Sequence, residues 1–153
     1  MKSKSNGLIV FLVTTIIVCL IVLVMSLEKS DGLKLGEDHL MNCTDIYGYC
    51  YDLFDFDYDR LIIFEPYESL ESMTEKVGFD YSGLKKSPDE KVMNFIFIKG
   101  ETVLYYVFGY PQHLGYDFFF EGVGEFTEKE VDACEYMREG KYFVVRGLDK
   151  YEQ

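Results

Sequence analysis

Residues 93–108 read MNFIFIKGETVLYYVF, and this stretch decides the fold of the chain. Two apolar runs, 93–98 and 102–108, flank Lys99-Gly100, a pair suited to the tight turn of a β-hairpin. The first run is apolar at nearly every position rather than at every second one. A strand with that pattern is buried on both faces, so we expect 93–98 in the middle of a sheet.

The segment before this hairpin predicts a strand and a helix. Residues 59–64 form an apolar run that Pro66 ends, because proline cannot donate to a central ladder. Residues 69–77 have helical apolar spacing, with Ser69 as the N-cap and Gly78 as the terminator. We therefore expect a strand followed by a short helix that packs on the sheet.

The segment after the hairpin predicts a strand over 116–120, a helix and a closing strand over 142–146. Thr127 and Glu130 have the spacing of a capping box, which begins a helix expected to run to about Arg138. The resulting order is β-α-β-β-β-α-β. It predicts an α+β fold with a small, mainly antiparallel sheet and two short helices.

The segment from Gly7 to Leu27 reads GLIVFLVTTIIVCLIVLVMSL and carries no charge. A helix of this length covers about 30 Å, the thickness of the hydrocarbon core of a bilayer. The segment therefore predicts an uncleaved transmembrane anchor, a single-pass signal-anchor. A cleaved signal peptide and a secreted product are the alternative, although the small-residue cleavage pattern is a poor match at Val24-Met25-Ser26.

Flanking charge predicts the orientation of this anchor. Two lysines precede it, and the residues that follow it are mostly acidic. Positive charge stays in the cytoplasm, so residues 1–6 are expected inside the cell and the rest of the chain outside it. We expect residues 28–52 to be a stalk or lead-in and residues 53–153 to be the extracytoplasmic domain.

The chain has 27 acidic and 15 basic residues, a formal net charge of −12. This acidity excludes a nucleic-acid partner, because such binding depends on Lys and Arg neutralising phosphates. Aromatic residues make up 17% of the chain, which gives ample material for a core. The runs Tyr105-Tyr106 and Phe118-Phe119-Phe120 place aromatics on both strand faces, so one face is a candidate recognition patch.

Several short motifs resemble those of small exported or lipoprotein-like domains from low-GC Gram-positive bacteria. They are the run 55–67 (DFDYDRLIIFEPY), the helix end at 77–79, the Gly100 turn, and the segments 108–111 and 115–118. The chain differs from that group at Tyr58, where tryptophan is usual, and in having a membrane helix in place of a lipobox. The resemblance implies an exported domain of the bacterial envelope, and it transfers no catalytic residue.

Asp55, Asp57 and Asp59 have the D-x-D-x-D spacing that opens an EF-hand calcium loop. The loop also needs glycine at its sixth position and glutamate at its twelfth, where this chain has Arg60 and Pro66. We therefore expect an edge of alternating faces, with the carboxylates outward. A weak, open cation site remains the alternative, since clustered carboxylates repel one another and a divalent ion would relieve that repulsion.

Cys43 and Cys50 flank a plausible turn in the part expected outside the cell, and they form a disulfide candidate. Two alternatives stay open: free thiols, or a zinc site with His39, although the spacing matches no standard zinc pattern. Cys134 lies on the inward face of the expected second helix, where a buried thiol is inert.

His113 is the best single candidate for acid–base chemistry, because it lies in a loop close to aromatic residues. No serine or cysteine nucleophile motif, zinc-protease motif or P-loop accompanies it, and we expect no cofactor. The sequence therefore favours a non-enzymatic module that binds a protein partner, and a small-molecule ligand is left open. The alternatives are an envelope hydrolase or metal-dependent enzyme that uses His113 and carboxylates, and a protective or inhibitory protein directed at a cationic partner.

Overall fold

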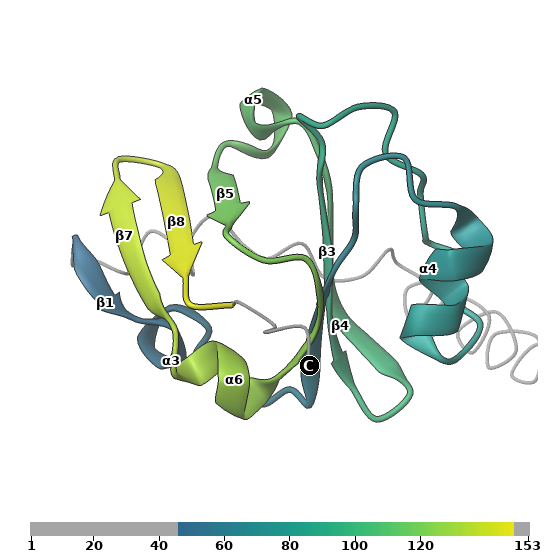
Figure 1. Ribbon diagram of the computed structural model, residues 1–153, viewed down its shortest axis with the longest axis horizontal. Helices are drawn as coiled ribbons and strands as arrows, with labels where there is room; N and C mark the ends of the chain where they lie inside the picture. Colours follow the sequence, from purple (N-terminus) through teal and green to yellow (C-terminus); the bar gives the residue numbers. More distant parts are fainter. Residues whose placement is uncertain (1–45, 149–153) are drawn as a thin grey trace, which may run out of the picture. The chain divides into compact units, whose positions relative to one another are not determined.

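The computed structural model describes residues 46–148, which form two four-stranded sheets joined by short helices and loops (Figure 1). The fold class is α+β, as the sequence predicts.

The predicted membrane anchor lies outside the described residues, from its first residue, Gly7, to its last, Leu27, and it stays a prediction. Cys43 and the other residues before Ile46 also lie outside them. Within 46–148, no helix has the length and hydrophobicity that crossing a membrane requires.

The first sheet contains the predicted hairpin. Its strands are β2 (Arg60–Ile63), β3 (Met93–Lys99), β4 (Thr102–Gly109) and β6 (Gly124–Thr127). They are ordered β4-β3-β2-β6, and every neighbouring pair is antiparallel. β3 lies between two partners and is buried from Met93 to Ile98, which confirms its predicted central position.

The second sheet is smaller. Its strands are β1 (Tyr47–Tyr49), β5 (Asp117–Phe120), β7 (Glu135–Glu139) and β8 (Tyr142–Arg146). They are ordered β1-β7-β8-β5. β5 and β8 are parallel, whereas the other two pairs are antiparallel.

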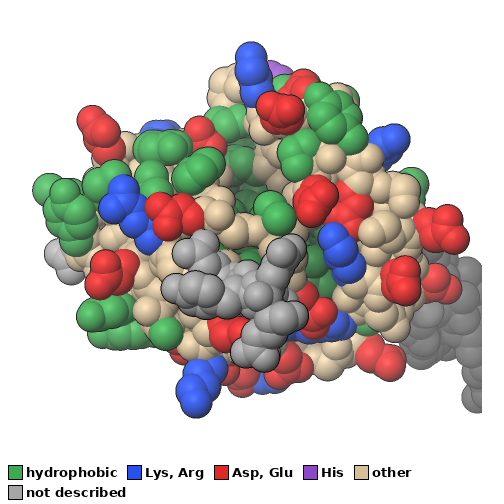
Figure 2. Space-filling model, viewed as in Figure 1, with side chains coloured by type: hydrophobic (Ala, Val, Ile, Leu, Met, Phe, Trp, Pro, Cys, Tyr) green, Lys and Arg blue, Asp and Glu red, His purple; other side chains and the backbone are tan. Residues whose placement is uncertain are grey.

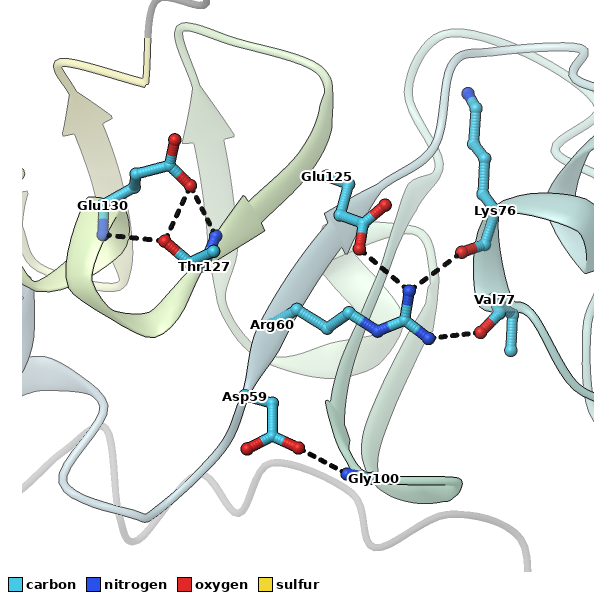
Figure 3. Close-up of polar contacts among 8 residues, drawn as sticks. All are labelled: Asp59, Arg60, Lys76, Val77, Gly100, Glu125, Thr127 and Glu130. Carbon is cyan, nitrogen blue, oxygen red and sulfur yellow. Dashed lines mark hydrogen bonds and ion pairs between the residues drawn. The ribbon is translucent and has the colours of Figure 1, made fainter.

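Four short helices connect the strands: α3 (Cys50–Leu53), α4 (Leu70–Val77), α5 (Pro111–Leu114) and α6 (Glu128–Asp132). Local sequence fixes the ends of α4 as predicted, since Ser69 Oγ accepts from the Ser72 amide and Gly78 adopts φ 83°. The predicted capping box of α6 is also present. Thr127 N donates to the Glu130 carboxylate at 2.7 Å, and Glu130 N donates to Thr127 Oγ1 (Figure 3).

Apolar side chains pack in two layers, one on each face of the first sheet. The larger layer, between the sheets, is mainly aromatic and includes Phe54, Tyr58, Phe97, Phe118 and Phe143. The smaller layer joins the opposite face of the first sheet to α4. The alternation along β3 separates the layers, because Phe95 and Phe97 belong to the first whereas Ile96 and Ile98 belong to the second.

Arg60 links two strands of the first sheet to α4 (Figure 3). From the start of β2 it forms an ion pair with Glu125 on β6 at 2.8 Å. The same guanidinium donates to the backbone carbonyls of Lys76 and Val77 in the last turn of α4. Carbonyls at this end of a helix have no partner within the helix, so the arginine acts as a C-terminal cap supplied by the sheet.

The prediction of one sheet and a helix from 127 to about Arg138 is wrong. The helix α6 ends at Asp132, and Glu135–Glu139 forms β7, which pairs with β8 across the turn at Gly140. Val131 and Cys134 are buried as predicted, but helical spacing does not continue through the segment. Pairing with the apolar strand β8 buries Tyr136, and this tertiary contact overrides the local helical preference.

Folded structure also begins earlier than the expected lead-in (28–52) suggests. β1 pairs with β7, and the side chains of Cys50 and Leu53 on α3 are buried. Between Phe54 and Asp59 the chain is not a regular strand, although the predicted alternation is present. Phe54 and Tyr58 are buried while the aspartates between and after them are exposed.

Candidate functional site

An open apolar groove of about 610 Å³ lies where β5 faces the ends of β2 and β3. Its walls come from six regions: the end of β2 and the residues after it, the start of β3 with the loop before it, α5, β5, Val123 in the loop after β5, and Tyr142 on β8. In Figure 2, hydrophobic side chains gather around a hollow beneath the end of the described part that carries α5. The groove is therefore made by both sheets, and neither sheet forms it alone.

The aromatic run of β5 explains why the groove is apolar. Strand geometry sends Phe118 into the core and Phe119 to the opposite side. Phe119 is 52% exposed, and it is joined along the groove by Val123 at 49% and Tyr142 at 39%. Exposed apolar side chains that gather on one concave surface are typical of an interaction site.

A few polar side chains are placed among these apolar ones. Glu90, Lys91, Gln112 and Asp117 line the groove. Burial raises the pKa of Asp117 above its usual value, although the adjacent Phe118 backbone amide opposes this shift. Partial desolvation makes such a carboxylate a stronger partner for a cation or a hydrogen-bond donor than one in bulk water.

A second hollow of about 460 Å³ adjoins the first and shares Pro111, Gln112, Asp117 and Tyr142 with it. It continues past Glu139 and Lys141, at the turn between β7 and β8. The shared residues make the two hollows one continuous surface.

Side-chain hydrogen bonds fix the loop that forms one wall. Tyr110, directly before α5, donates to Asp89 Oδ2 at 2.6 Å. Asn94 on β3 is buried and donates to Ser87 Oγ at 3.0 Å, and the Lys85 amide donates to the Tyr106 hydroxyl at 2.9 Å. These bonds hold the loop against β3, β4 and α5, so the groove is preformed.

His113 does not line this groove. Its side chain is exposed on α5, and its ring lies edge-on to Tyr110 with the ring centres 6.0 Å apart. Among residues 46–148, no hydrogen bond or ion pair joins the imidazole to a carboxylate. Over the described residues, the structure therefore brings no carboxylate to this imidazole.

Two of the three aspartates, Asp57 and Asp59, contact the β3–β4 turn instead of forming a loop about an ion, and Asp55 is exposed. Asp57 forms an ion pair with Lys99. Asp59 accepts a hydrogen bond from the Gly100 amide (Figure 3). The hydrogen bond that Lys99 donates to Asp57 raises the pKa of Lys99. In the described part of the chain, no three His, Cys, Asp or Glu side chains converge as a metal would require.

Exposed tyrosines also gather on β1 and α3, a place that no motif in the sequence marks. Tyr47, Tyr49 and Tyr51 project from β1 and α3, and the rings of Tyr49 and Tyr51 stack with centres 5.8 Å apart. Tyr105 and Tyr106, which were candidates for a surface patch, are half-buried. Tyr106 packs against the smaller core layer, and its hydroxyl holds the groove loop.

Comparison with known proteins adds no relative: no family model, no curated protein and no solved structure matches the chain. Functional inference therefore rests on the groove. Its residues come from distant parts of the sequence, and only the run Phe118-Phe119-Phe120 signalled it in advance. Val123 and Tyr142 have no distinctive motif around them, so sequence reasoning missed both.

Proposed function

We propose that this chain is a membrane-anchored, extracytoplasmic binding module of the cell envelope, and that its groove binds an apolar segment of a partner protein. The observation that carries the proposal is the exposure of Phe119, Val123 and Tyr142 along one preformed hollow. Keeping these side chains in water is unfavourable, by about 25 cal/mol for each Å² of apolar surface. A partner that covers them recovers this free energy.

The dimensions of the groove support a side chain or short peptide as its occupant. Small-ligand sites usually have volumes of roughly 300–1,000 Å³, and the groove lies within that range at about 610 Å³. Aromatic anchors that insert into such hollows dominate the binding energy of most protein interfaces. We infer that one or two large apolar side chains of the partner enter here.

The negative charge of the domain favours a partner that carries basic residues next to the apolar side chains that enter the groove. Between residues 46 and 148, acidic side chains outnumber basic ones by two to one. Glu90 and Asp117 line the groove itself, with Lys91 as the basic residue among its lining. A negative surface speeds the approach of a cationic partner and makes its association sensitive to salt.

The proposed location rests on the segment from Gly7 to Leu27, whose length and lack of charge suit a membrane span. A fusion of reporter enzymes to the C-terminus of the full chain tests the orientation. We expect activity from a reporter that works only outside the cytoplasm. Activity from a strictly cytoplasmic reporter would overturn the topology but leave the groove proposal in place.

Binding is tested with the full-length chain in mild detergent and defined fluorescent peptides. One peptide carries Phe and Leu flanked by lysines, a second replaces the lysines with glutamates, and a third replaces Phe and Leu with serine. We expect the first to bind with the highest affinity by fluorescence anisotropy, more weakly at high salt. If the third peptide bound as tightly as the first, charge alone would account for the binding, and the proposal would be overturned.

Matched variants locate the binding surface. Phe119→Ser removes a groove aromatic, whereas Leu70→Ser removes a similarly exposed apolar side chain from α4. We expect Phe119→Ser to weaken binding of the Phe/Leu–lysine peptide by about tenfold or more, and Leu70→Ser to leave it unchanged. Tyr47→Ser tests the exposed tyrosines of β1 and α3 in the same assay. Loss of binding in that variant alone would move the site to β1.

A further inference from the structure

Cys50 and Cys134 face each other across the sheet. The last matched pair of β1 and β7 is Tyr49 with Glu135, and continuing that register by one residue places Cys50 opposite Cys134. The hydrogen bond from Cys50 N to Cys134 O, at 2.9 Å, shows that the register does continue. The two cysteines are 84 positions apart in sequence but adjacent in space.

Both side chains also project from the same face of the sheet. Directly opposite residues in an antiparallel pair share a face, and residues two positions along share it again. Gly48 and Tyr136 show which face this is, because a Cβ at Gly48 would lie 2.7 Å from the Tyr136 ring. Cys50 and Cys134 lie two positions further on, and both belong to the core layer between the sheets.

The backbone spacing at this position suits a disulfide. Opposite residues joined by a ladder hydrogen bond have Cα atoms about 5.5 Å apart. Disulfides bridge Cα atoms roughly 4.4–6.8 Å apart, a range that includes this spacing. Both cysteines are free thiols in this structure, with exposed fractions of 0% for Cys50 and 3% for Cys134.

We propose that Cys50 and Cys134 form the intramolecular disulfide of this domain when the chain meets a small-molecule disulfide such as oxidised glutathione. One cysteine thiolate attacks the glutathione disulfide and expels one glutathione thiolate. The second cysteine then attacks the mixed disulfide, and the other glutathione thiolate leaves. Two protein thiols lose two protons and two electrons, and one glutathione disulfide becomes two glutathione thiols.

Burial determines when this exchange takes place. Burial raises the pKa of the Cys50 and Cys134 thiols, so the folded dithiol contains little of the reactive thiolate. Oxidation therefore occurs before β1 and α3 dock, or when they open. Once formed, the bond ties β1 and α3 to β7 covalently.

This pairing competes with the Cys43–Cys50 candidate, because both require Cys50. It does not depend on what the groove binds. Trypsin distinguishes the two, since the peptide 35–60 carries both Cys43 and Cys50 whereas Cys134 lies in the peptide 130–138. A bond between the peptides differs in mass from a bond within 35–60.

The test oxidises the full-length chain in mild detergent with oxidised glutathione, alkylates remaining thiols, and maps tryptic peptides without reduction. We expect 35–60 linked to 130–138, and the same link in the Cys43→Ser variant, where Cys50 is the cysteine left in the first peptide. An internal bond in 35–60 with alkylated Cys134 would overturn the proposal. So would full alkylation of both cysteines after refolding in the presence of the oxidant.

A thermal measurement gives a second readout that does not need a cysteine deletion in the core. Oxidised Cys43→Ser protein should unfold at a higher temperature than the same protein after reduction, because the cross-link restricts the unfolded chain. Cys134→Ala added to Cys43→Ser serves as a control in which the oxidant should leave the unfolding temperature unchanged. If that variant does not fold, the peptide map of Cys43→Ser still decides the pairing.

Discussion

The hydroxyl of Tyr110 donates a 2.6 Å hydrogen bond to Asp89 Oδ2, and this contact joins the start of α5 to the loop before β3. It lowers the pKa of Asp89 and raises the pKa of Tyr110, as expected when a phenol hydrogen is shared with a carboxylate. Both neighbours of the pair, Glu90 and Pro111, line the groove. The contact therefore fixes the width of the proposed binding surface.

Tyr110→Phe should loosen this wall while leaving the two sheets intact. We expect faster amide hydrogen exchange in residues 110–115 and weaker binding of the Phe/Leu–lysine peptide, with little change in the exchange of β3. Hydrogen exchange with mass spectrometry measures both regions in one experiment. If amide hydrogen exchange in α5 were unchanged, packing would be sufficient to hold this wall of the groove without the Tyr110 hydrogen bond.

The same pair gives a pH dependence whose sign follows from its pKa shifts. Asp89 has a lowered pKa, so its contribution to folding stability is present at pH values above the ordinary aspartate pKa of about 3.9. That contribution is lost as the pH falls through the lowered pKa. Tyr110 has a raised pKa, so its contribution to folding stability is lost only as the pH rises above about 10. The difference in unfolding temperature between the wild type and Tyr110→Phe should therefore be largest near neutral pH and narrow at both extremes. A difference that stays constant from acid to alkaline pH would contradict this.

Phe118 and Phe119 are neighbours with opposite environments. The buried Phe118 ring stacks on Phe143 with centres 4.8 Å apart, whereas Phe119 is exposed in the groove. Phe118→Ala should lower the free energy of unfolding by about 3–5 kcal/mol, and Phe119→Ala should change it by roughly 0.5 kcal/mol or less. Urea denaturation followed by circular dichroism compares them. Equal losses would show that Phe119 serves stability instead of binding.

Arg60→Met should destabilise the domain through α4. The change removes the hydrogen bonds to the Lys76 and Val77 carbonyls as well as the ion pair with Glu125. We expect a loss of about 1–2 kcal/mol from the helix carbonyls. Glu125→Gln is the matched control, because it weakens only a partly exposed ion pair and should cost about 1 kcal/mol or less. Similar losses in the two variants would assign the effect to the ion pair.

Gly48→Ala tests whether β1 is packed as tightly as its register indicates. Its new Cβ would lie 2.7 Å from the buried ring of Tyr136, so the ring or the strand must move. We expect a loss of about 1–3 kcal/mol in urea denaturation. Gly100→Ala at the β3–β4 turn is the comparison variant, because a Cβ there would contact no other atom. Gly100 has φ 57°, so this variant measures the cost of the backbone conformation alone, about 1–2 kcal/mol. A smaller loss at Gly48 than at Gly100 would show that β1 adjusts freely.

Elements whose signals are local were predictable from sequence. Ser69 and Gly78 bracket α4, and the Thr127–Glu130 box begins α6, because each cap satisfies backbone groups within four residues of itself. The β3–β4 hairpin follows from its turn and from two uninterrupted apolar runs. The alternation of Phe54 and Tyr58 with exposed aspartates is likewise a local pattern, although regular strand pairing begins only at Arg60.

Elements that depend on distant partners were missed. β1 has three residues and exists because β7 pairs with it, while β7 exists because β8 lies across the Gly140 turn. In sequence, the spacing of Val131, Cys134 and Met137 suits a helix equally well. The division into two sheets follows from these pairings, so one sheet was the natural expectation.

The amino-acid sequence is sufficient to identify the apolar segment at 7–27, the acidic charge, the α+β class and the caps of the short helices, since each depends on composition or on residues close together along the chain. Tertiary structure alone decided that Phe119, Val123 and Tyr142 share one groove, and that Cys50 lies opposite Cys134. The physical reason is that strand pairing joins residues far apart in sequence. Its register is set by the burial of whole faces, which no local pattern encodes.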